Sequence, residues 1–185
     1  MKQIMKMVLV LTVLGLVSGL VLSLVSNYAT PIINENNREA IKEAIFYVLP
    51  KTEDYEVKTI EGKDIYVTRD SEGQVNGYAF TASGSGYQGT IELMVGVNSN
   101  LEEIQGIQVL DSSETPGLGG KIRGDNFKNK FRGEDASGGV SLVKSAPTEP
   151  GEIEAITGAT ISSKAVVDII NKGLDQVQEI MGSGG

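Results

Sequence analysis

The sequence predicts an α+β protein with a single N-terminal transmembrane helix and one soluble domain, in which a mostly antiparallel sheet is flanked by helices. Three observations predict this class. The chain begins with a long uncharged apolar stretch, continues with short β-branched segments separated by turn residues, and ends with apolar residues at helical spacing. Closely spaced strands joined by short turns pair antiparallel, and helices outside such a run of strands define the α+β class.

The first element is a membrane span. Residues 7–25 carry no charge and are rich in Val and Leu, and about 20 such residues cross a bilayer core as a helix. We therefore expect residues 1–26 to be a cytoplasmic start and transmembrane anchor. Lys2 and Lys6 precede the span, whereas the next basic residue is Arg38. The positive-inside rule then places the N-terminus in the cytoplasm and the remaining chain on the extracytoplasmic side of the cell membrane.

A cleaved signal peptide is the alternative interpretation of this N-terminal segment. Signal peptides have shorter apolar cores and a cleavage site with small residues at a fixed spacing. The sequence after the span, Ser26-Asn27-Tyr28-Ala29, offers no good pair of small residues at that spacing. An uncleaved, single-pass anchor is therefore expected.

Residues 27–50 are expected to form a connecting helix that leads out of the membrane. Apolar residues recur there at helical spacing, and Pro50 ends the pattern. The residues that share the apolar face are Ile41, Ala44, Ile45, Val48 and Leu49.

Residues 51–181 are expected to form the soluble domain, with most of its strands first. Runs rich in β-branched and aromatic residues alternate there with Gly, Asn and Ser turn signals. The domain should end in a helix, and residues 182–185 should be a disordered tail. The expected elements are strands at 55–60, 64–69, 74–82, 90–97 and 103–110, a helical turn or two at 125–131, a last strand at 140–144, and a loop at 147–151.

Composition excludes several kinds of chemistry. The chain has no Cys and no His, so zinc, haem and iron–sulfur ligation are all but excluded, and no metal site is expected. A cysteine protease or a Ser–His–Asp hydrolase is excluded for the same reason, and no catalytic residue is expected. The net charge of −8 argues against a nucleic-acid partner. Any redox chemistry must therefore come from an organic cofactor.

The run Thr157-Gly158-Ala159-Thr160 stands where the last helix begins. A helix start exposes unpaired N–H groups and the positive end of the macrodipole, where a phosphate is favoured. Gly158 and Ala159 are small, so the Thr160 hydroxyl should be accessible. The alternative is that Thr160 is an ordinary helix cap. The expected apolar face of the helix consists of Ile161, Ala165, Val166, Ile169, Ile170, Leu174 and Val177.

A second motif, Glu114-Thr115-Pro116-Gly117-Leu118-Gly119, lies some forty residues earlier. Pro fixes φ at one turn position and Gly permits a positive φ at the next, so the loop should have a defined turn. Such a turn can present Glu114, the Thr115 hydroxyl and backbone amides to a planar heterocycle, with Leu118 as an apolar surface. The alternative is a plain surface turn.

A third glycine-rich segment contains Gly84, Gly86 and Gly89. It has the spacing of a dinucleotide-binding loop, but that fingerprint must follow a strand and open a helix. Here a strand is expected to follow, so we interpret the glycines as turn residues. Tyr87 should either pack at the sheet edge or lie near a bound cofactor, and packing is the prediction.

Taken together, these motifs resemble the covalent FMN-binding domain found in the G subunit of the Rnf electron-transport complex and in the C subunit of the sodium-pumping NADH:quinone reductase. The similarity runs from about residue 77 to 178. It implies that Thr160 carries FMN by a phosphoester. The position six residues before the modified Thr, usually Asp in this family, is Glu154 here. The resemblance assigns Thr157, Gly158 and Ala159 to the phosphate end, Glu114, Thr115, Leu118 and Gly119 to the isoalloxazine, and Lys121 to the phosphate or ring, unless that lysine is merely solvated.

The resemblance also implies a function. An Rnf-type complex moves electrons between ferredoxin and NAD⁺ with coupled Na⁺ or H⁺ translocation, and this chain would be its electron relay. The implied partners are the other Rnf-complex subunits, the membrane, and a flavin transferase during maturation. Because no charged residue lies within the span, the ion path is expected in other subunits. The alternatives are the C subunit of the quinone reductase, a free-standing membrane-anchored extracellular flavoprotein reductase, and a non-redox binding module.

Overall fold

The structure, a computed structural model, describes residues 1–60 and 62–182. The expected disordered tail therefore lies outside the described residues, except for Gly182, which ends the last helix. Contacts divide the chain into two compact units, Met1–Ala40 and Ile41–Gly185. The first unit is helical from Lys2 onward, and the second holds the end of the same helix, the sheet and the remaining helices.

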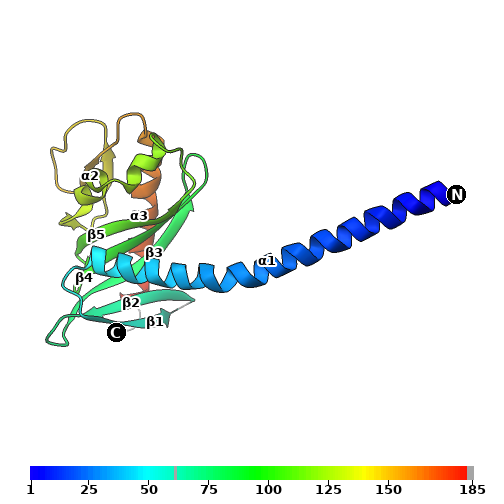
Figure 1. Cartoon of the computed structure of the whole chain (residues 1–185). Helices are drawn as coiled ribbons and strands as arrows, with labels where there is room; N and C mark the ends of the chain where they lie inside the picture. The colour runs from blue at the N-terminus through cyan, green and yellow to red at the C-terminus, as the bar shows by residue number, and fades with distance from the viewer. Residues whose placement is uncertain (61, 183–185) are drawn as a thin grey trace. The chain divides into compact units, whose positions relative to one another are not determined.

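Helix α1 extends over Lys2–Val48 as one element (Figure 1). In the described part of the chain it is the one helix long and apolar enough to cross a membrane. The sequence predicted a span and a separate connecting helix, yet the helix continues through Pro31. Proline removes one helical N–H and therefore costs one backbone bond, and here the Thr30 hydroxyl donates to the Ser26 carbonyl at 2.7 Å on the turn before it.

The second unit contains a sheet with the strand order β1-β2-β3-β4-β5-β6, in which every neighbouring pair is antiparallel. The first five strands confirm the sequence prediction to within about three residues at each end. The short β6 was not predicted. The bounds are β1 Asp54–Ile60, β2 Lys63–Arg69, β3 Val75–Ser85, β4 Thr90–Asn98, β5 Glu103–Ser112 and β6 Glu134–Asp135.

The last third of the chain adds short helices and a small parallel ladder. The expected helical turns at 125–131 are present as two consecutive elements, and the expected strand at 140–144 is β7. The strand β7 is not the last one, because β8 pairs with it and inserts between the 147–151 loop and the final helix. The bounds are η1 Gly119–Arg123, α2 Asp125–Lys128, η2 Asn129–Phe131, β7 Ser141–Val143, β8 Glu152–Glu154 and α3 Thr160–Gly182.

Both faces of the main sheet are covered. Side chains alternate between faces along a strand, so Phe80 packs toward α3, whereas its neighbour Ala79 packs toward the end of α1. The approach of α1 is close at Gly96, where an added Cβ would lie 2.7 Å from a methyl of Val48. The α3 side of the core includes Ile65, Phe80, Leu93, Val95, Ala165, Val166, Ile170 and Leu174. The α1 side includes Ala44, Ile45, Val48, Leu49, Tyr66, Ala79 and Met94.

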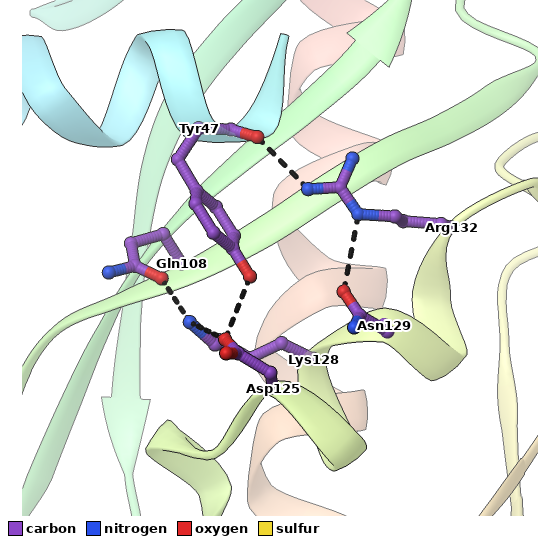
Figure 2. Close-up of polar contacts among 6 residues, drawn as sticks. All are labelled: Tyr47, Gln108, Asp125, Lys128, Asn129 and Arg132. Carbon is purple, nitrogen blue, oxygen red and sulfur yellow. Dashed lines mark hydrogen bonds and ion pairs between the residues drawn. The ribbon is translucent and has the colours of Figure 1, made fainter. Parts of the chain in front are cut away.

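A polar cluster holds the end of α1 against β5 and α2 (Figure 2). The buried Lys128 ammonium donates to Gln108 Oε1 at 2.7 Å and pairs with Asp125 at 2.9 Å, and it lies 4.3 Å from the centre of the Tyr47 ring. The Tyr47 hydroxyl also donates to Asp125 at 3.0 Å, and Arg132 donates to the Tyr47 carbonyl at 3.0 Å. Hydrogen bonds from Lys128 and then Tyr47 lower the pKa of the Asp125 carboxyl. The buried ammonium is therefore fully paired, as a buried charge requires.

Candidate functional site

Two tight turns frame the candidate site. In one, the Leu118 N–H donates to the Thr115 carbonyl at 3.2 Å; in the other, the Ala159 N–H donates to the Ile156 carbonyl at 2.9 Å. The third residue of each turn is a glycine with positive φ, +78° at Gly117 and +80° at Gly158. This is the conformation that glycine adopts without strain. The turn predicted at Pro116-Gly117 is confirmed, and the Thr160 motif turns in the same way.

These turns and the β3–β4 loop enclose one pocket of about 410 Å³. Three segments of the chain that are distant in sequence therefore meet here, each contributing a motif that the sequence analysis singled out. The residues that line the pocket are Tyr87, Thr115, Leu118, Gly119, Gly158, Ala159, Thr160, Ile161 and Ser162.

The remaining predicted residues lie outside this pocket. Glu114 is buried beneath it. Thr157 and Lys121 line a neighbouring pocket of about 670 Å³, which also contains Lys130 and Glu154. The roles assigned to Glu114, Thr157 and Lys121 as direct contacts of a cofactor thus stay predictions, and their positions differ from those of the residues around Thr160.

Thr160 is the first residue of α3, and its side chain is exposed. In the part of the chain that the structure describes, no hydrogen bond is made by its hydroxyl, so Thr160 does not act as a capping side chain. The buried Ser163 instead connects the helix to the turn before it, because its hydroxyl accepts from the Ile156 N–H at 3.1 Å and donates to the Ala159 carbonyl at 2.9 Å. Ser162 is also buried and bonded. Among the hydroxyls of the first helical turn, Thr160 is the accessible one.

Glu114 connects the three segments from below. Its carboxylate accepts from the Ser162 hydroxyl on α3 and, at 2.9 Å, from the Gln88 N–H in the β3–β4 loop. Burial raises the pKa of Glu114, but the Ser162 hydroxyl and the amides of Gln88, Tyr87 and Gly89 outweigh it and hold this pKa below its ordinary value. The group is therefore a buried carboxylate that fixes the geometry of the pocket.

Gly119 packs directly on this carboxylate. A Cβ added there would lie 2.6 Å from Ser162 Oγ and closer still to Glu114 Oε2. The glycine of the Leu118-Gly119 pair is required by this close approach, whereas Gly117 is required by its φ. Gly119 also lines the pocket, so its predicted contact with a cofactor stays a prediction.

We expect Gly119→Ala to lower the free energy of unfolding by about 1–3 kcal/mol, since the new methyl must displace two buried polar groups. Thermal melting of the full-length chain in detergent measures this. The matched control is Gly138→Ala, where the nearest atom to an added Cβ is 3.5 Å away in ordinary contact. Equal melting temperatures for the two variants would contradict the steric argument.

Exposed apolar side chains gather around Thr160. Tyr87, Leu118 and Ile161 are 69%, 54% and 59% exposed, and all three line the pocket. In the described residues from 41 onward, Val57 is the one other large apolar side chain in the exposed class. The prediction that Tyr87 packs at the sheet edge is therefore wrong, and so is the placement of Ile161 on the buried face. Ile161 lies in the first turn of α3, where the helix borders the pocket.

Sequence reasoning missed Gln88, Ser162 and Ser163. Gln88 accepts a hydrogen bond from the Thr115 hydroxyl, and the two serines connect α3 to Glu114 and to the turn before the helix. Their partners lie far away in the chain: Ser162 and Glu114 are 48 residues apart. The one local signal was the presence of two serines in a helical first turn, where Ser commonly forms local backbone bonds.

Comparisons with known proteins agree with this geometry. A family described as "FMN-binding domain" matches residues 86–175. The chain is 34% identical over 184 residues to the G subunit of the "Ion-translocating oxidoreductase complex" of Methanosarcina acetivorans, covering 95% of each chain. It is 32% identical to the G subunit of the "Na(+)-translocating ferredoxin:NAD(+) oxidoreductase complex" of Acetobacterium woodii, covering 97% of this chain and 94% of that one.

Solved structures support the fold. The crystal structure of NqrC from Shewanella oneidensis superposes with a TM-score of 0.57 at 22% identity, over 68% of this chain and 64% of that one. The C subunit of the Na(+)-translocating NADH-quinone reductase of Parabacteroides distasonis gives a TM-score of 0.53 at 26% identity, over 71% and 63%. This chain thus spans less than two thirds of each. The resemblance stated from the motifs is confirmed, and the chain belongs to the family of G subunits of ion-translocating oxidoreductase complexes, with an FMN-binding domain.

Proposed function

We propose that Thr160 carries FMN through a phosphoester on its Oγ, and that the chain relays electrons through this flavin within a membrane-bound ferredoxin:NAD⁺ oxidoreductase. The observation that carries the proposal is the exposed Thr160 hydroxyl at the start of α3, which forms no hydrogen bond with any described residue and lies in a pocket built from three separate motifs. As a member of its family, the chain is an electron-transfer subunit of an ion-translocating oxidoreductase. The covalent linkage is the further step.

The start of α3 fits the phosphate end of FMN. The first backbone bond into the helix is donated by Ser163 to the Ala159 carbonyl at 2.9 Å. The preceding N–H groups of the first turn have no partner within the helix and, with the macrodipole, favour an anionic group beside Thr160. Gly158 leaves open space at its Cα, since nothing lies within 4 Å of an added Cβ. A phosphate on Thr160 would thus meet no steric barrier at this turn.

The rim of the pocket fits the ring end. Tyr87 and Leu118 are exposed on the two loops, and Ile161 is exposed on the helix. Three large apolar side chains left in water are unfavourable unless a ligand or partner covers them. A planar isoalloxazine tethered at Thr160 would cover them, with Glu114 fixing the loops from below. When bound, FMN supplies the electron-transfer chemistry that the side chains of this chain lack.

Formation of the ester needs an activated flavin. We propose FAD as the donor and a flavin transferase as the catalyst. A bond forms between Thr160 Oγ and the FMN phosphorus, the anhydride bond of FAD breaks, AMP leaves with the electron pair, and the hydroxyl proton passes to solvent. No electrons are gained or lost in this step. The ester would keep the flavin on the protein, because a tethered flavin stays at high effective concentration beside its pocket, whereas a dissociated one is diluted.

We propose that the N-terminus is cytoplasmic and the FMN domain extracytoplasmic, since Lys2 and Lys6 precede the span without basic residues close behind it. The proposed organisation keeps residues 1–26 as the anchor, 27–50 as the connecting helix and 51–181 as the FMN-binding domain. The chain lacks Cys, so labelling of one introduced cysteine shows on which side of the membrane that residue lies.

We expect a membrane-impermeant maleimide to label Ser99→Cys in intact cells, because Ser99 is exposed in the turn between β4 and β5. Gln3→Cys, the matched cytoplasmic control, should be labelled only after permeabilisation. Labelling of Gln3→Cys but not Ser99→Cys in intact cells would reverse the proposed orientation.

The proposed partners are the other components of the complex. The quinone-reductase alternative is disfavoured by coverage: the C subunit of the Na(+)-translocating NADH-quinone reductase of Yersinia pestis matches 58% of this chain and 43% of its own length. The G subunits of Methanosarcina acetivorans and Acetobacterium woodii match this chain almost end to end, whereas those of Escherichia coli and Vibrio cholerae match 58% and 54% of it. The two full-length matches also disfavour a free-standing flavoprotein. Relatives named for Na⁺ and for proton translocation are 32% and 30% identical, so we place ion selection in other subunits, in keeping with the uncharged residues 7–25.

Intact-protein mass spectrometry of the native chain tests the attachment. The expected mass is that of the polypeptide plus one FMN less one water, and tandem fragmentation should place the addition on Thr160. The same material should give a fluorescent band on a denaturing gel. An unmodified mass from electron-transferring membranes would exclude the proposed linkage.

A further inference from the structure

The segment between β8 and α3 leads directly to the attachment threonine, and hydrogen bonds hold this segment at several points. The Ala155 N–H donates to the Val143 carbonyl of β7 at 2.8 Å. The Ile156 N–H donates to Ser163 Oγ at 3.1 Å. The turn that ends at Ala159 follows directly. The position of the Thr160 hydroxyl therefore depends on where this segment begins, which is Glu154 at the end of β8.

Glu154 is held by the β7–β8 ladder, in which it pairs with Val143, and by a lysine that contacts it twice. The Lys130 ammonium donates to Glu154 Oε2 at 2.9 Å and to the Glu154 backbone carbonyl at 3.2 Å. Lys130 belongs to η2, whose next residue, Phe131, is fully buried and packs edge-on against Phe127 with ring centres 5.3 Å apart. The lysine thus projects from an anchored turn, so its two hydrogen bonds position the backbone as well as the carboxylate.

The same pair forms part of the wall of the larger pocket. Lys130, Glu154 and Thr157 line it together, on the stretch of chain leading to Thr160. The side chains of Lys130 and Glu154 are 32% and 43% exposed. An ion pair at this exposure contributes little to overall stability, so its effect should be local, on the path of residues 155–157.

We infer that Glu154 promotes flavin attachment from within the chain: paired with Lys130, it is a positioning residue that sets the path of the segment carrying Thr160. The alternative is that the flavin transferase contacts the Glu154 carboxylate directly. This inference rests on the proposed attachment at Thr160. It assigns a role to Lys130, which lies outside every motif that the sequence analysis identified. It also accounts for Glu at this position, since its longer side chain reaches the Lys130 ammonium.

The test measures the initial rate at which the full-length chain, made without transferase, acquires a fluorescent band when FAD and purified flavin transferase are added. We expect Lys130→Met and Glu154→Gln each to slow incorporation about fivefold, the size of effect expected from losing one partly exposed ion pair. The charge swap, Lys130→Glu with Glu154→Lys, restores the side-chain ion pair but not the hydrogen bond to the backbone carbonyl of residue 154, so it should recover the rate in part, above that of either single variant. The matched control is Lys164→Met, which removes the exposed Lys164–Asp168 pair on α3 and should leave the rate unchanged.

Hydrogen exchange gives a readout that needs no flavin. In Lys130→Met the amides of residues 155–159 should exchange faster than in wild type, with the sheet amides unchanged. Incorporation by Lys130→Met at the wild-type rate, with Glu154→Gln slow, would overturn the inference in favour of direct contact by the transferase. A charge swap no faster than the single variants would overturn it too. A wild-type chain that stays dark would instead reject the attachment itself, and exchange at 155–159 would still decide whether Lys130 holds the segment.

Discussion

Replacing Thr160 by Ala is expected to abolish covalent flavin completely. The substitution removes the one exposed hydroxyl in the first turn of α3, which has no hydrogen-bond partner among the described residues. The neighbouring Ser162 and Ser163 are 3% and 0% exposed and already hydrogen-bonded. Neither serine is therefore a substitute acceptor. Fluorescence of the denatured band, followed by intact mass, measures the loss.

Two control variants make this prediction specific. Ser145→Ala removes an exposed hydroxyl that lines neither the pocket around Thr160 nor the neighbouring one and should keep the flavin. Thr160→Ser keeps a hydroxyl at the same helical position and should be modified, more slowly if the transferase contacts the methyl group. The fold of Thr160→Ala should be intact, because the side chain makes no hydrogen bond in the described part of the chain. A boiling-resistant fluorescent band in Thr160→Ala would contradict the linkage.

The sequence predicted those parts of the fold whose signals are local. The five long strands are each bounded by Gly, Asn or Ser turns, and the apolar period of α3 is regular from Ala165 onward. Gly117 and Gly158 indicate their turns because few other residues adopt a positive φ. In each case the preference lies in the residue itself or in its close neighbours, so a single sequence is enough to predict the element or the turn.

The features that were missed depend on partners elsewhere in the chain. The strands β6 and β8 are two and three residues long and exist only through pairing with β5 and β7. The burial of Glu114 depends on hydrogen-bond partners in α3 and in the β3–β4 loop, which lie far from it in the sequence. Tyr87 was predicted to pack, since an aromatic residue beside a strand usually does. The exposure of Tyr87 is explained by its place in the pocket that also contains Thr160.

Replacing Glu114 by Gln is expected to lower the free energy of unfolding by about 1–3 kcal/mol at neutral pH. The carboxylate accepts from the Ser162 hydroxyl and from the Gln88 amide, and an amide group cannot accept at both of its ends. One buried donor is then left without a partner, which is the costly outcome. Urea unfolding of the full-length chain in detergent measures the difference. Glu179→Gln is the matched control, because Glu179 is exposed on α3 and its carboxylate forms no hydrogen bond or ion pair with any described residue.

The pH dependence of this difference identifies its cause. Hydrogen bonding holds the pKa of Glu114 in the folded chain below its ordinary value, which is about 4.3. The stabilisation is therefore fully present above that ordinary value and is lost as the pH falls through the lower, folded one. The gap between wild type and Glu114→Gln should thus narrow below about pH 4.

The wild-type curve alone does not isolate Glu114, because Asp125, Asp135 and Glu152 also have lowered pKa values and weaken the fold on acidification in the same direction. Those three groups are present in both proteins and cancel in the difference between them. A gap that stayed constant from neutral pH to about pH 3 would mean that the charge on Glu114 contributes nothing. The carboxylate would then act by shape alone, and the lowered pKa would have no part in holding the two loops to α3.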